Sequence, residues 1–457
     1  MAHFDVLILG GGSGGYACAL RAAQLGLTVG LVEKGKLGGT CLHAGCIPTK
    51  ALLHAAEVAD ATREAGQFGV QATFDGIDMP AVRSYQEGVV ARLYKGLSGL
   101  VASRGITLIE GEGRLSGPLS VTVGDETHTG TDVVLATGSR SKTLPGLEVD
   151  GERVITSDHA LGLDHVPASV IVLGGGVIGC EFASVWRSFG AEVTIVEALP
   201  RLVPPEDEAS SKVLERAFRK RGIKARTATS FESVARTDAG VAVTVAGGDV
   251  LEADLLLVAV GRGPVTDGLG YEEAGLALDR GFVVTDERLR TNLDHTYAVG
   301  DIVPGLQLAH RGFQQGIFVA EEIAGRSPVP IDETGIPRVT YSHPEVASVG
   351  LTEAQAVERY GADAVTATTY DLGGNGKSQI LKTSGFVKLV ADGMGRVVGI
   401  HLVGDRMGEL IGEAQLIYGW EATAADVAPL VHAHPTQNEA LGEAHLALAG
   451  KPLHSHS

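Results

Sequence analysis

The sequence predicts an α/β protein in which two doubly wound parallel-sheet units precede a smaller α+β domain. A glycine-rich motif occurs twice, and each copy lies between two apolar runs of the kind that form buried strands. From about residue 337 the pattern changes to alternating strands followed by helices. A chain of 457 residues is long enough for about three domains, which is the number that these observations require.

The chain is acidic, with 37 Lys and Arg against 55 Asp and Glu and a formal net charge of −18. This balance argues against a nucleic-acid or anionic-membrane surface, because both require clustered cations. Four cysteines are too few for a secreted disulfide framework in a chain of this length. The predicted first strand at 4–9 follows no basic or apolar leader, and no apolar run reaches 18 residues. We therefore expect a cytoplasmic protein.

The first glycine motif follows the apolar run 6–9 and contains Gly10, Gly12 and Gly15. In such a motif the first glycine forms a tight turn and the second allows the backbone to approach a pyrophosphate. The third allows the following helix to pack closely on the strand. Glu33 ends the next apolar run, at the place where an acid accepts hydrogen bonds from an adenosine ribose. This spacing predicts a Rossmann-like dinucleotide-binding unit.

A second unit repeats the pattern at a constant offset of 164 residues without a gap. The apolar run 170–173 leads into Gly174, Gly176 and Gly179, and Glu197 ends the following strand. Because 63 residues are glycine, the bare motif is expected about once by chance, so the surrounding strands, helix and acid carry the prediction. Glu197 would repel a 2′-phosphate, and no arginine follows it directly, which favours NAD over NADP. Glycine-rich turns without a ligand are the structural alternative.

Two cysteines five positions apart, Cys41 and Cys46, follow the first unit. A regular helix separates such residues by about 8.6 Å between Cα atoms, whereas a disulfide requires less than about 7 Å. The helix must therefore be distorted if the two pair, and Pro48 is expected to contribute because it has no N–H for the carbonyl of Ala44. Lys50 shares a helix face with Cys46 if the helix holds, and its cation would favour a thiolate. The alternatives are two reduced structural cysteines and a solvated lysine.

The strand pattern after the second unit predicts that one domain is inserted in another. Apolar runs end at 138 and 262, and a further strand at 296–301 lies too far along to belong to the second unit. We expect the first domain to resume near residue 267. The predicted boundaries are 1–145 and 267–336 for the first domain, 146–266 for the inserted domain and 337–457 for the last, whose helices are expected near 407–420 and 437–449.

A histidine and a glutamate near the C-terminus form the last candidate cluster. His434 precedes Pro435, which holds it in an extended conformation, and thiol exchange requires a base with a near-neutral pKa. Thr436 and Glu439 match a capping box, in which Thr436 is the N-cap of a helix. Glu439 can fill this role and also orient His434. The alternative is an exposed or structural histidine, and His432 is the weaker catalytic candidate.

With these motifs in place, the chain resembles the pyridine nucleotide-disulfide oxidoreductases, and among them the dihydrolipoamide dehydrogenases. The resemblance is carried by the two glycine units, the cysteine segment 38–50 and the segment 434–439. An Ala-Thr-Gly turn at 136–138, a Gly-Asp turn at 300–301 and the segment 341–347 occur in the family's order. The resemblance spans nearly the whole chain.

The resemblance implies FAD in the first fold, NAD in the second and no metal. Its FAD residues are Gly10, Gly12, Gly15, Glu33, Lys50, Thr137, Gly138, Asp301 and Ala309. Its NAD residues are Gly174, Gly176, Gly179, Glu197 and Gly261. It also implies a redox-active disulfide in which Cys46 lies next to the flavin and Cys41 exchanges with substrate. Lys50 is then paired with Glu181 near the flavin, and His434 is the catalytic base, oriented by Glu439.

The implied activity is oxidation of dihydrolipoamide to lipoamide with reduction of NAD, as the E3 component of 2-oxo acid dehydrogenase complexes. The implied partners are the lipoyl domain of an acyltransferase (E2) component and a second copy of the chain. In the family the C-terminal α+β dimerisation domain lends its histidine to the partner's disulfide. The alternatives are a related flavoprotein reductase for a low-molecular-weight thiol disulfide or mercuric ion, and a flavin-bound assembly subunit without turnover.

Overall fold

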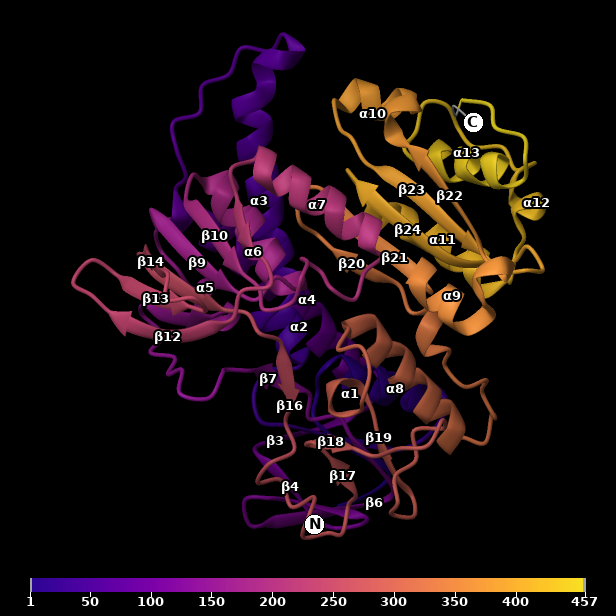
Figure 1. Ribbon diagram of the computed structural model, residues 1–457. Helices are drawn as coiled ribbons and strands as arrows, with labels where there is room; N and C mark the ends of the chain where they lie inside the picture. The colour runs from indigo at the N-terminus through magenta and orange to yellow at the C-terminus, as the bar shows by residue number, and fades with distance from the viewer. Residues whose placement is uncertain (1, 455–457) are drawn as a thin grey trace.

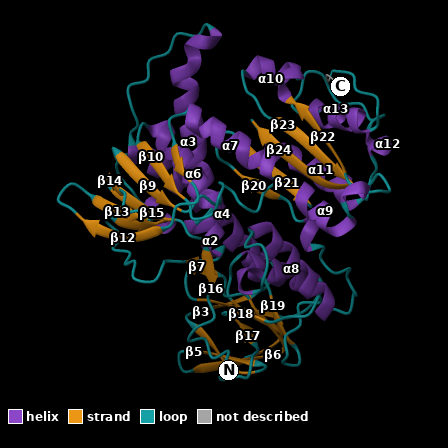
Figure 2. Cartoon of the chain, viewed as in Figure 1, coloured by secondary structure: helices purple, strands orange, loops and turns teal. Residues whose placement is uncertain are grey.

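The computed structural model describes residues 2–454, which fold into three regions, each built on its own main sheet (Figure 1). The N-terminal region lies lowest in Figure 1, the second region lies at the left, and the C-terminal region lies at the upper right. Helices cover the sheets and fill the space where the regions meet (Figure 2). The predicted fold class, with two parallel-sheet units and a third α+β domain, is confirmed.

The first sheet has the strand order β3-β2-β1-β6-β5-β4, and β19 pairs with β6. Its strands are β1 (His3–Leu9), β2 (Val29–Glu33), β3 (Thr107–Glu110), β4 (Gly113–Gly117), β5 (Ser120–Val123), β6 (Glu126–Leu135) and β19 (Thr296–Ala298). Helices α1 (Ser13–Gln24) and α8 (Ala309–Ile323) pack together against it, and Val6, Leu7 and Ile8 are fully buried. Because β19 returns to this sheet in parallel with β6, the first domain does resume after an insertion.

The second sheet lies between those two parts of the chain and has the parallel order β11-β10-β9-β15-β8. Its strands are β8 (Val154–Thr156), β9 (Ser169–Leu173), β10 (Glu192–Val196), β11 (Lys224–Arg226) and β15 (Leu255–Val258). Around it lie α5 (Ser157–Ala160), α6 (Val177–Phe189), α7 (Glu208–Lys220) and an antiparallel sheet of β12 (Phe231–Arg236), β13 (Val241–Val245) and β14 (Val250–Ala253). The chain enters and leaves this region through an antiparallel ribbon of β7 (Ser139–Ser141) and β16 (Arg262–Pro264).

The C-terminal region has an antiparallel sheet of order β20-β21-β24-β23-β22. Its strands are β20 (Arg338–Thr340), β21 (Glu345–Gly350), β22 (Thr366–Asp371), β23 (Phe386–Ala391) and β24 (Val397–Gly404). Its helices are α9 (Glu353–Tyr360), α10 (Gly376–Leu381), α11 (Met407–Gly419), α12 (Ala424–Val427) and α13 (Glu439–Leu448). Every residue of β23 and β24 is buried, because the sheet is covered on both faces. Helices α11 and α13 cover one face, and α7 and α9 contact β24 where Val403 and Val398 are buried in two other apolar clusters.

Three helices connect the first sheet to the other regions: α2 (Gly39–Ala44), α3 (Cys46–Glu64) and α4 (Met79–Ser103). Helix α3 packs against both α4 and α6, so it joins the first region to the second. The remaining elements are β17 (Leu278–Asp279), β18 (Phe282–Val283) and 3-10 helices at Ala65–Phe68, Gly300–Ile302, Glu333–Gly335, Ala362–Ala364 and Leu372–Gly374. The exact domain boundaries at 145, 266 and 336 stay predictions.

Helix α13 begins at Glu439, so the expectation that Thr436 is its N-cap is wrong. The reciprocal bonds of a capping box are present, because the Thr436 N–H donates to Glu439 Oε2 and the Glu439 N–H donates to Thr436 Oγ1. However, the Thr436 carbonyl accepts a bond from Asn375 Nδ2 at 3.0 Å. The first turn uses the next two carbonyls instead, because the N–H groups of Ala440 and Leu441 donate to the carbonyls of Gln437 and Asn438.

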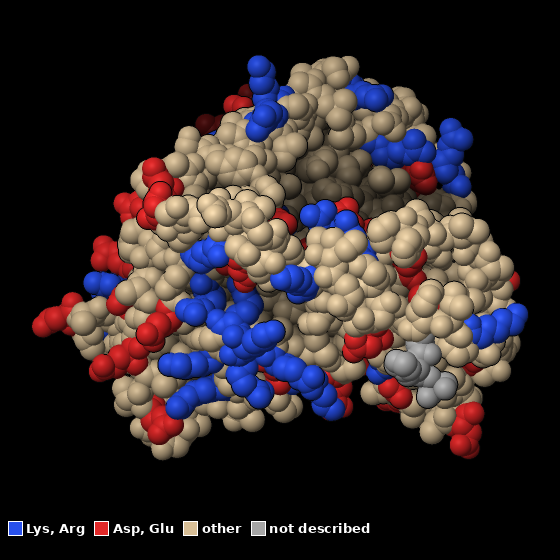
Figure 3. All heavy atoms as spheres, turned by 90° about the horizontal axis from the view of Figure 1, so that it is seen from above, with Lys and Arg blue, Asp and Glu red and all other residues tan. Residues whose placement is uncertain are grey.

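Charge is unevenly distributed over the surface. Figure 3 shows the densest group of Lys and Arg on the side of the second region, where α7 and the residues after it are basic. The basic residues of this stretch are Lys212, Arg216, Arg219, Lys220, Arg221, Lys224 and Arg226. Within residues 2–454, no helix combines the length and the apolar character needed to cross a membrane.

Candidate active site

The two glycine turns have the same backbone geometry. Gly10 and Gly174 have φ of +107° and +110°, which side chains with a Cβ rarely adopt. A Cβ on Gly15 would lie 1.8 Å from the Gly10 carbonyl oxygen, and one on Gly179 would lie 1.9 Å from that of Gly174. The first and third glycines of each motif are therefore required by the chain's own packing.

The middle glycines are different, because a Cβ on Gly12 or Gly176 would have no described atom within 4 Å. The packing of the chain does not require glycine there. Both residues lie at the N-terminus of a helix, where free N–H groups and the helix dipole favour an anion. The two open cradles therefore fit the pyrophosphates of two dinucleotides.

The predicted acids also occupy equivalent positions. Glu33 accepts hydrogen bonds from the N–H groups of Gly11 and Gly35, both at 2.7 Å. Glu197 accepts bonds from Gly175 at 2.6 Å and Leu199 at 2.7 Å, at the same offset of 164. Each carboxylate is thus fixed beside its glycine turn, where a ribose diol can donate to the remaining lone pairs.

The other predicted FAD residues lie directly after strands β6 and β19 of the first sheet or at the start of α8. Asp301 accepts a bond from the Ser139 hydroxyl, which in turn accepts one from Arg262 Nε at 2.8 Å. The Thr137 hydroxyl donates to the Val265 carbonyl at 2.6 Å, so the chain itself fixes this side chain. Gly138 has φ of +76°, and Ala309 is the first residue of α8. In the second unit, Gly261 has φ of +101° and open space around it.

The cysteine segment is broken between the two thiols. Helix α2 ends at Ala44 and α3 begins at Cys46, with Gly45 between them. A Cβ on Gly45 would lie 3.0 Å from the Thr40 carbonyl oxygen, so the close approach of the two helices favours glycine. The predicted distortion is confirmed, but it is centred on Gly45, and Pro48 lies in the first turn of α3.

Cys41 and Cys46 are both half-buried free thiols, and each affects the pKa of the other. A hydrogen bond from Cys41 and the nearby Lys50 cation lower the pKa of Cys46 to about 7, although burial opposes this. The same hydrogen bond, together with burial, raises the pKa of Cys41. Near neutral pH, Cys46 is therefore the thiol of the pair that ionises to the thiolate.

Lys50 and Glu181 form an ion pair between α3 and α6, as the resemblance implies. Lys50 Nζ lies 3.0 and 2.9 Å from the two oxygens of Glu181, whose side chain is only 3% exposed. Burial opposes the charge on Lys50, but the carboxylate outweighs it and raises the pKa of the lysine. The pair keeps a cation four residues from Cys46.

Sequence reasoning missed a third member of this cluster, Tyr341. Its N–H donates to Glu181 Oε1 at 3.0 Å, and Lys50 Nζ lies 4.8 Å from the centre of its ring. The segment 341–347 was recognised only as a family motif, and no local pattern indicates that its first residue contacts helices α3 and α6.

His434 and Glu439 form a dyad in the C-terminal region. His434 Nδ1 lies 2.8 Å from Glu439 Oε1, and the other carboxylate oxygen accepts the Thr436 N–H at 2.8 Å. Burial opposes the charge on Glu439, but these bonds lower its pKa. The His434 side chain is 76% exposed, and Figure 1 shows α13 far from α2. One chain therefore does not bring the histidine to the cysteines.

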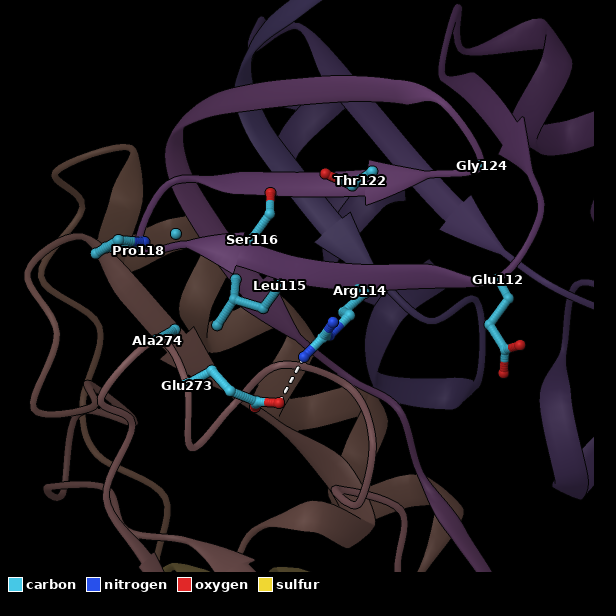
Figure 4. Close-up of a pocket in the computed structure, with 10 residues that line it drawn as sticks. Glu112, Arg114, Leu115, Ser116, Pro118, Thr122, Gly124, Glu273 and Ala274 are labelled. Carbon is cyan, nitrogen blue, oxygen red and sulfur yellow. Dashed lines mark hydrogen bonds and ion pairs between the residues drawn. The ribbon is translucent and has the colours of Figure 1, made fainter.

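A surface cavity of about 640 Å³ lies apart from all of these residues (Figure 4). It is formed by the β4–β5 hairpin and residues 273–274, with an ion pair between Arg114 and Glu273 across it. None of its lining residues is a predicted site residue. Among residues 2–454, no group of three or more His, Cys, Asp and Glu side chains is arranged to hold a metal ion.

Comparison with known proteins agrees with this arrangement. Residues 4–316 match the family model described as pyridine nucleotide-disulphide oxidoreductase, and residues 336–445 match the dimerisation domain of that family. The chain is 41% identical to dihydrolipoyl dehydrogenase of Bacillus subtilis over 472 residues, or 99% of each chain. It is 42% identical to that of Mycobacterium bovis over 466 residues, or 98% of this chain and 99% of the relative.

Solved structures share the complete fold. LpdA from Mycobacterium tuberculosis has a TM-score of 0.90 at 28% identity, with 98% of this chain and 100% of that chain covered. RclA from Escherichia coli, an HOCl-induced flavoprotein disulfide reductase, has a TM-score of 0.87 at 27% identity, with 96% and 99% covered. All these matches extend through the three regions.

Proposed function

The chain belongs to the pyridine nucleotide-disulphide oxidoreductase family, and on this premise we propose that it oxidises dihydrolipoamide to lipoamide. As a member it is a flavoprotein oxidoreductase that uses FAD and NAD(H), and its dimerisation domain gives a homodimer. The observation that carries the proposed substrate is the full-length similarity to dihydrolipoyl dehydrogenases, together with a thiol pair on α2 and α3. Gly39 of α2 lies close to Gly12 of the first cradle, and α3 packs on α6 of the second unit.

The chain's own residues account for the thiol steps. His434 accepts a proton from one substrate thiol, and the resulting thiolate attacks Cys41 Sγ of the oxidised pair, so that the Cys41–Cys46 bond breaks. The second substrate thiol attacks the substrate sulfur bonded to Cys41 and forms the disulfide of lipoamide, and its proton passes to the departing Cys41 sulfur, whose pKa is raised. Two electrons have then moved from the substrate to Cys41 and Cys46, the dithiol form in which the structure holds them.

The cofactors would be held by the two cradles described above. Bound FAD supplies two-electron transfer from the dithiol to NAD. The low pKa of Cys46 and the Lys50 cation keep a thiolate available on α3 for that transfer. Glu197 favours NAD, because its carboxylate faces the ribose position and would repel a 2′-phosphate.

A lipoamide assay tests this function. Purified protein is expected to be yellow, to hold about one FAD per chain and to reduce lipoamide with NADH. Cys46→Ser is expected to abolish lipoamide reduction and to leave flavin reduction by NADH intact, because only the thiol half-reaction needs the pair. Turnover of glutathione disulfide or mycothione disulfide in place of lipoamide would reject the proposed substrate.

We also propose that each active site is shared between two chains. His434 is exposed and lies five residues before α13, which Figure 1 shows far from α2, whereas its base function requires contact with substrate at Cys41. Heterodimers of Cys46→Ser and His434→Gln chains, purified through two different tags, should recover activity because one site is intact. Heterodimers as inactive as both parents would reject the shared site.

The proposed protein partner is the lipoyl domain of an acyltransferase (E2) component, in a cytoplasmic 2-oxo acid dehydrogenase complex. The family resemblance and the proposed dihydrolipoamide activity support it. Reduction of a lipoylated domain at a lower KM than free lipoamide would be the expected result. Equal KM values would argue that the substrate is a small thiol.

A further inference from the structure

We infer that Tyr341 is a positioning residue, through which the C-terminal domain fixes the Lys50–Glu181 pair beside the redox-active thiols. The inference rests on the proposed function, because it concerns the thiols that the proposed reaction uses. Lys50 belongs to the first domain, Glu181 to the second and Tyr341 to the third, so the cluster is made where three domains meet.

Tyr341 makes two different contacts with the ion pair. Its backbone N–H donates to Glu181 Oε1 at 3.0 Å, and the same oxygen accepts Lys50 Nζ at 3.0 Å. Its ring lies 4.8 Å from that ammonium group, within the range of a cation–π interaction. The tyrosine therefore holds the carboxylate through its backbone and the cation through its side chain.

The backbone around Tyr341 is itself tied to α6. The N–H of His343 donates to Ser184 Oγ at 3.0 Å, and Ser184 is one helical turn after Glu181. Arg221 then donates to the His343 carbonyl at 3.0 Å and also bonds Asp60 of α3. Segment 341–343 is thus attached to α6 at two successive turns, which fixes where the tyrosine ring lies.

The position of Lys50 matters because few charged groups face the thiols. Cys46 is influenced by Cys41 from α2, Lys50 from its own helix and Glu181 from α6, and Tyr16 of α1 faces both cysteines. Of these groups, Lys50 alone is a cation that stabilises the thiolate. Without the ring, Glu181 alone holds the ammonium group, so Lys50 spends more time turned toward solvent, and the ionisation of the Cys41–Cys46 pair shifts to higher pH.

The test is a pH profile of thiol ionisation in FAD-loaded, reduced protein. Iodoacetamide labels the pair at a rate that follows its thiolate, and peptide masses identify the labelled cysteine. For Tyr341→Leu we expect the midpoint to rise by about half a pH unit or more, which is about twofold slower labelling at pH 7. Tyr341→Phe keeps the ring and the N–H, so it should retain the wild-type profile.

A matched control is Tyr360→Leu, because the Tyr360 ring also lies near a cation, Arg359 at 5.4 Å, in the same domain but away from the thiols. It should leave the midpoint unchanged. Ser184→Ala loosens the attachment of segment 341–343 without changing the ring, and it should shift the midpoint in the same direction. An unchanged midpoint in Tyr341→Leu, or in Ser184→Ala if Tyr341→Leu does not fold, would overturn the inference.

The labelling profile is independent of the substrate. Wild-type protein without lipoamide turnover would reject the proposed function while the shift in Tyr341→Leu still supported the positioning role. Conversely, full lipoamide turnover in the wild type with no shift in either variant would reject the positioning role alone.

Discussion

The two dinucleotide units have nearly identical glycine turns, but the helix that follows each turn packs against a different part of the protein. The bonds from Gly11 and Gly35 to Glu33 recur at Gly175, Leu199 and Glu197. Helix α1, however, packs on α8 of its own domain, where a Cβ on Gly316 would lie 2.2 Å from the Gly14 carbonyl oxygen. Helix α6 instead packs on α3, the helix that begins with Cys46.

One equivalent position shows the consequence of this difference. Ala17 of α1 and Glu181 of α6 are separated by the offset of 164, and both are buried. A Cβ on Gly316 would lie 3.2 Å from the Ala17 Cβ, so α1 and α8 pack closely here, whereas Glu181 binds Lys50 and Tyr341. At this position the first unit contributes only to helix packing, whereas the second unit places a carboxylate beside Lys50.

The largest expected effect comes from the third glycine of each unit. In Gly15→Ala and Gly179→Ala the new Cβ would meet a carbonyl oxygen at 1.8 or 1.9 Å, which we expect to cost about 3 kcal/mol or more. Gly15→Ala should be purified without flavin absorbance. Gly179→Ala should keep its FAD and bind NADH at least about tenfold more weakly, measured by titration. Normal NADH binding in Gly179→Ala would show that the two units are not equivalent.

The next largest effect tests the contact that α6 makes and α1 lacks, the ion pair of Glu181 with Lys50. Glu181→Ala leaves Lys50 without its partner, and we expect a loss of about 1–3 kcal/mol in the free energy of unfolding, since Lys50 can still turn to solvent. Folding raises the pKa of Lys50. The ion pair therefore contributes fully to the free energy of unfolding at any pH below the pKa of an unfolded lysine, and this contribution is lost only as pH rises through the pKa of Lys50 in the folded protein. The loss should be equal at pH 6 and pH 9 in urea unfolding. The exposed Glu192→Ala is the control, with no measurable loss expected.

A smaller effect is expected from the two acids Glu33 and Glu197, whose removal should affect different cofactors. Glu197→Ala removes the carboxylate that we propose as the ribose ligand of NAD, and the preference for NADH over NADPH should shrink about tenfold in kcat/KM. Glu33→Ala should lower FAD content and leave that preference unchanged. A wild type that used both nucleotides equally would show that Glu197 does not select the cofactor.

The smallest effect on the fold is expected at the middle glycines. Gly12→Ala and Gly176→Ala place a methyl group in open space, so stability without dinucleotide should change by less than about 0.5 kcal/mol. Ligand binding should weaken in both, because the methyl group occupies the path of the pyrophosphate. Thermal unfolding with and without NADH separates the two effects in Gly176→Ala. Unchanged dinucleotide binding in these variants would mean that the pyrophosphate does not pass next to Gly12 or Gly176.

The sequence predicted what depends on local spacing. The glycine turns, Glu33 and Glu197 lie where the motifs put them, because a strand-turn-helix unit specifies its own geometry. The Lys50–Glu181 pair joins residues 131 positions apart, and only the family resemblance indicated it. The contact of Tyr341 with α6 was not predictable, since it joins residues 160 positions apart. The start of α13 was misplaced by two residues, because the capping-box bonds of Thr436 and Glu439 form while Asn438 is the N-cap.

The ribbon of β7 and β16 makes the second unit an exchangeable module. Ser141 and Arg262 are direct partners in its register, so the ends of the segment 142–261 lie within one strand spacing, about 5 Å. A different nucleotide-binding domain with adjacent termini can therefore be grafted at this point without stretching the first domain. Such a graft keeps the thiols and loses the carboxylate beside Lys50, so a working chimera must supply its own acid at the position of Glu181.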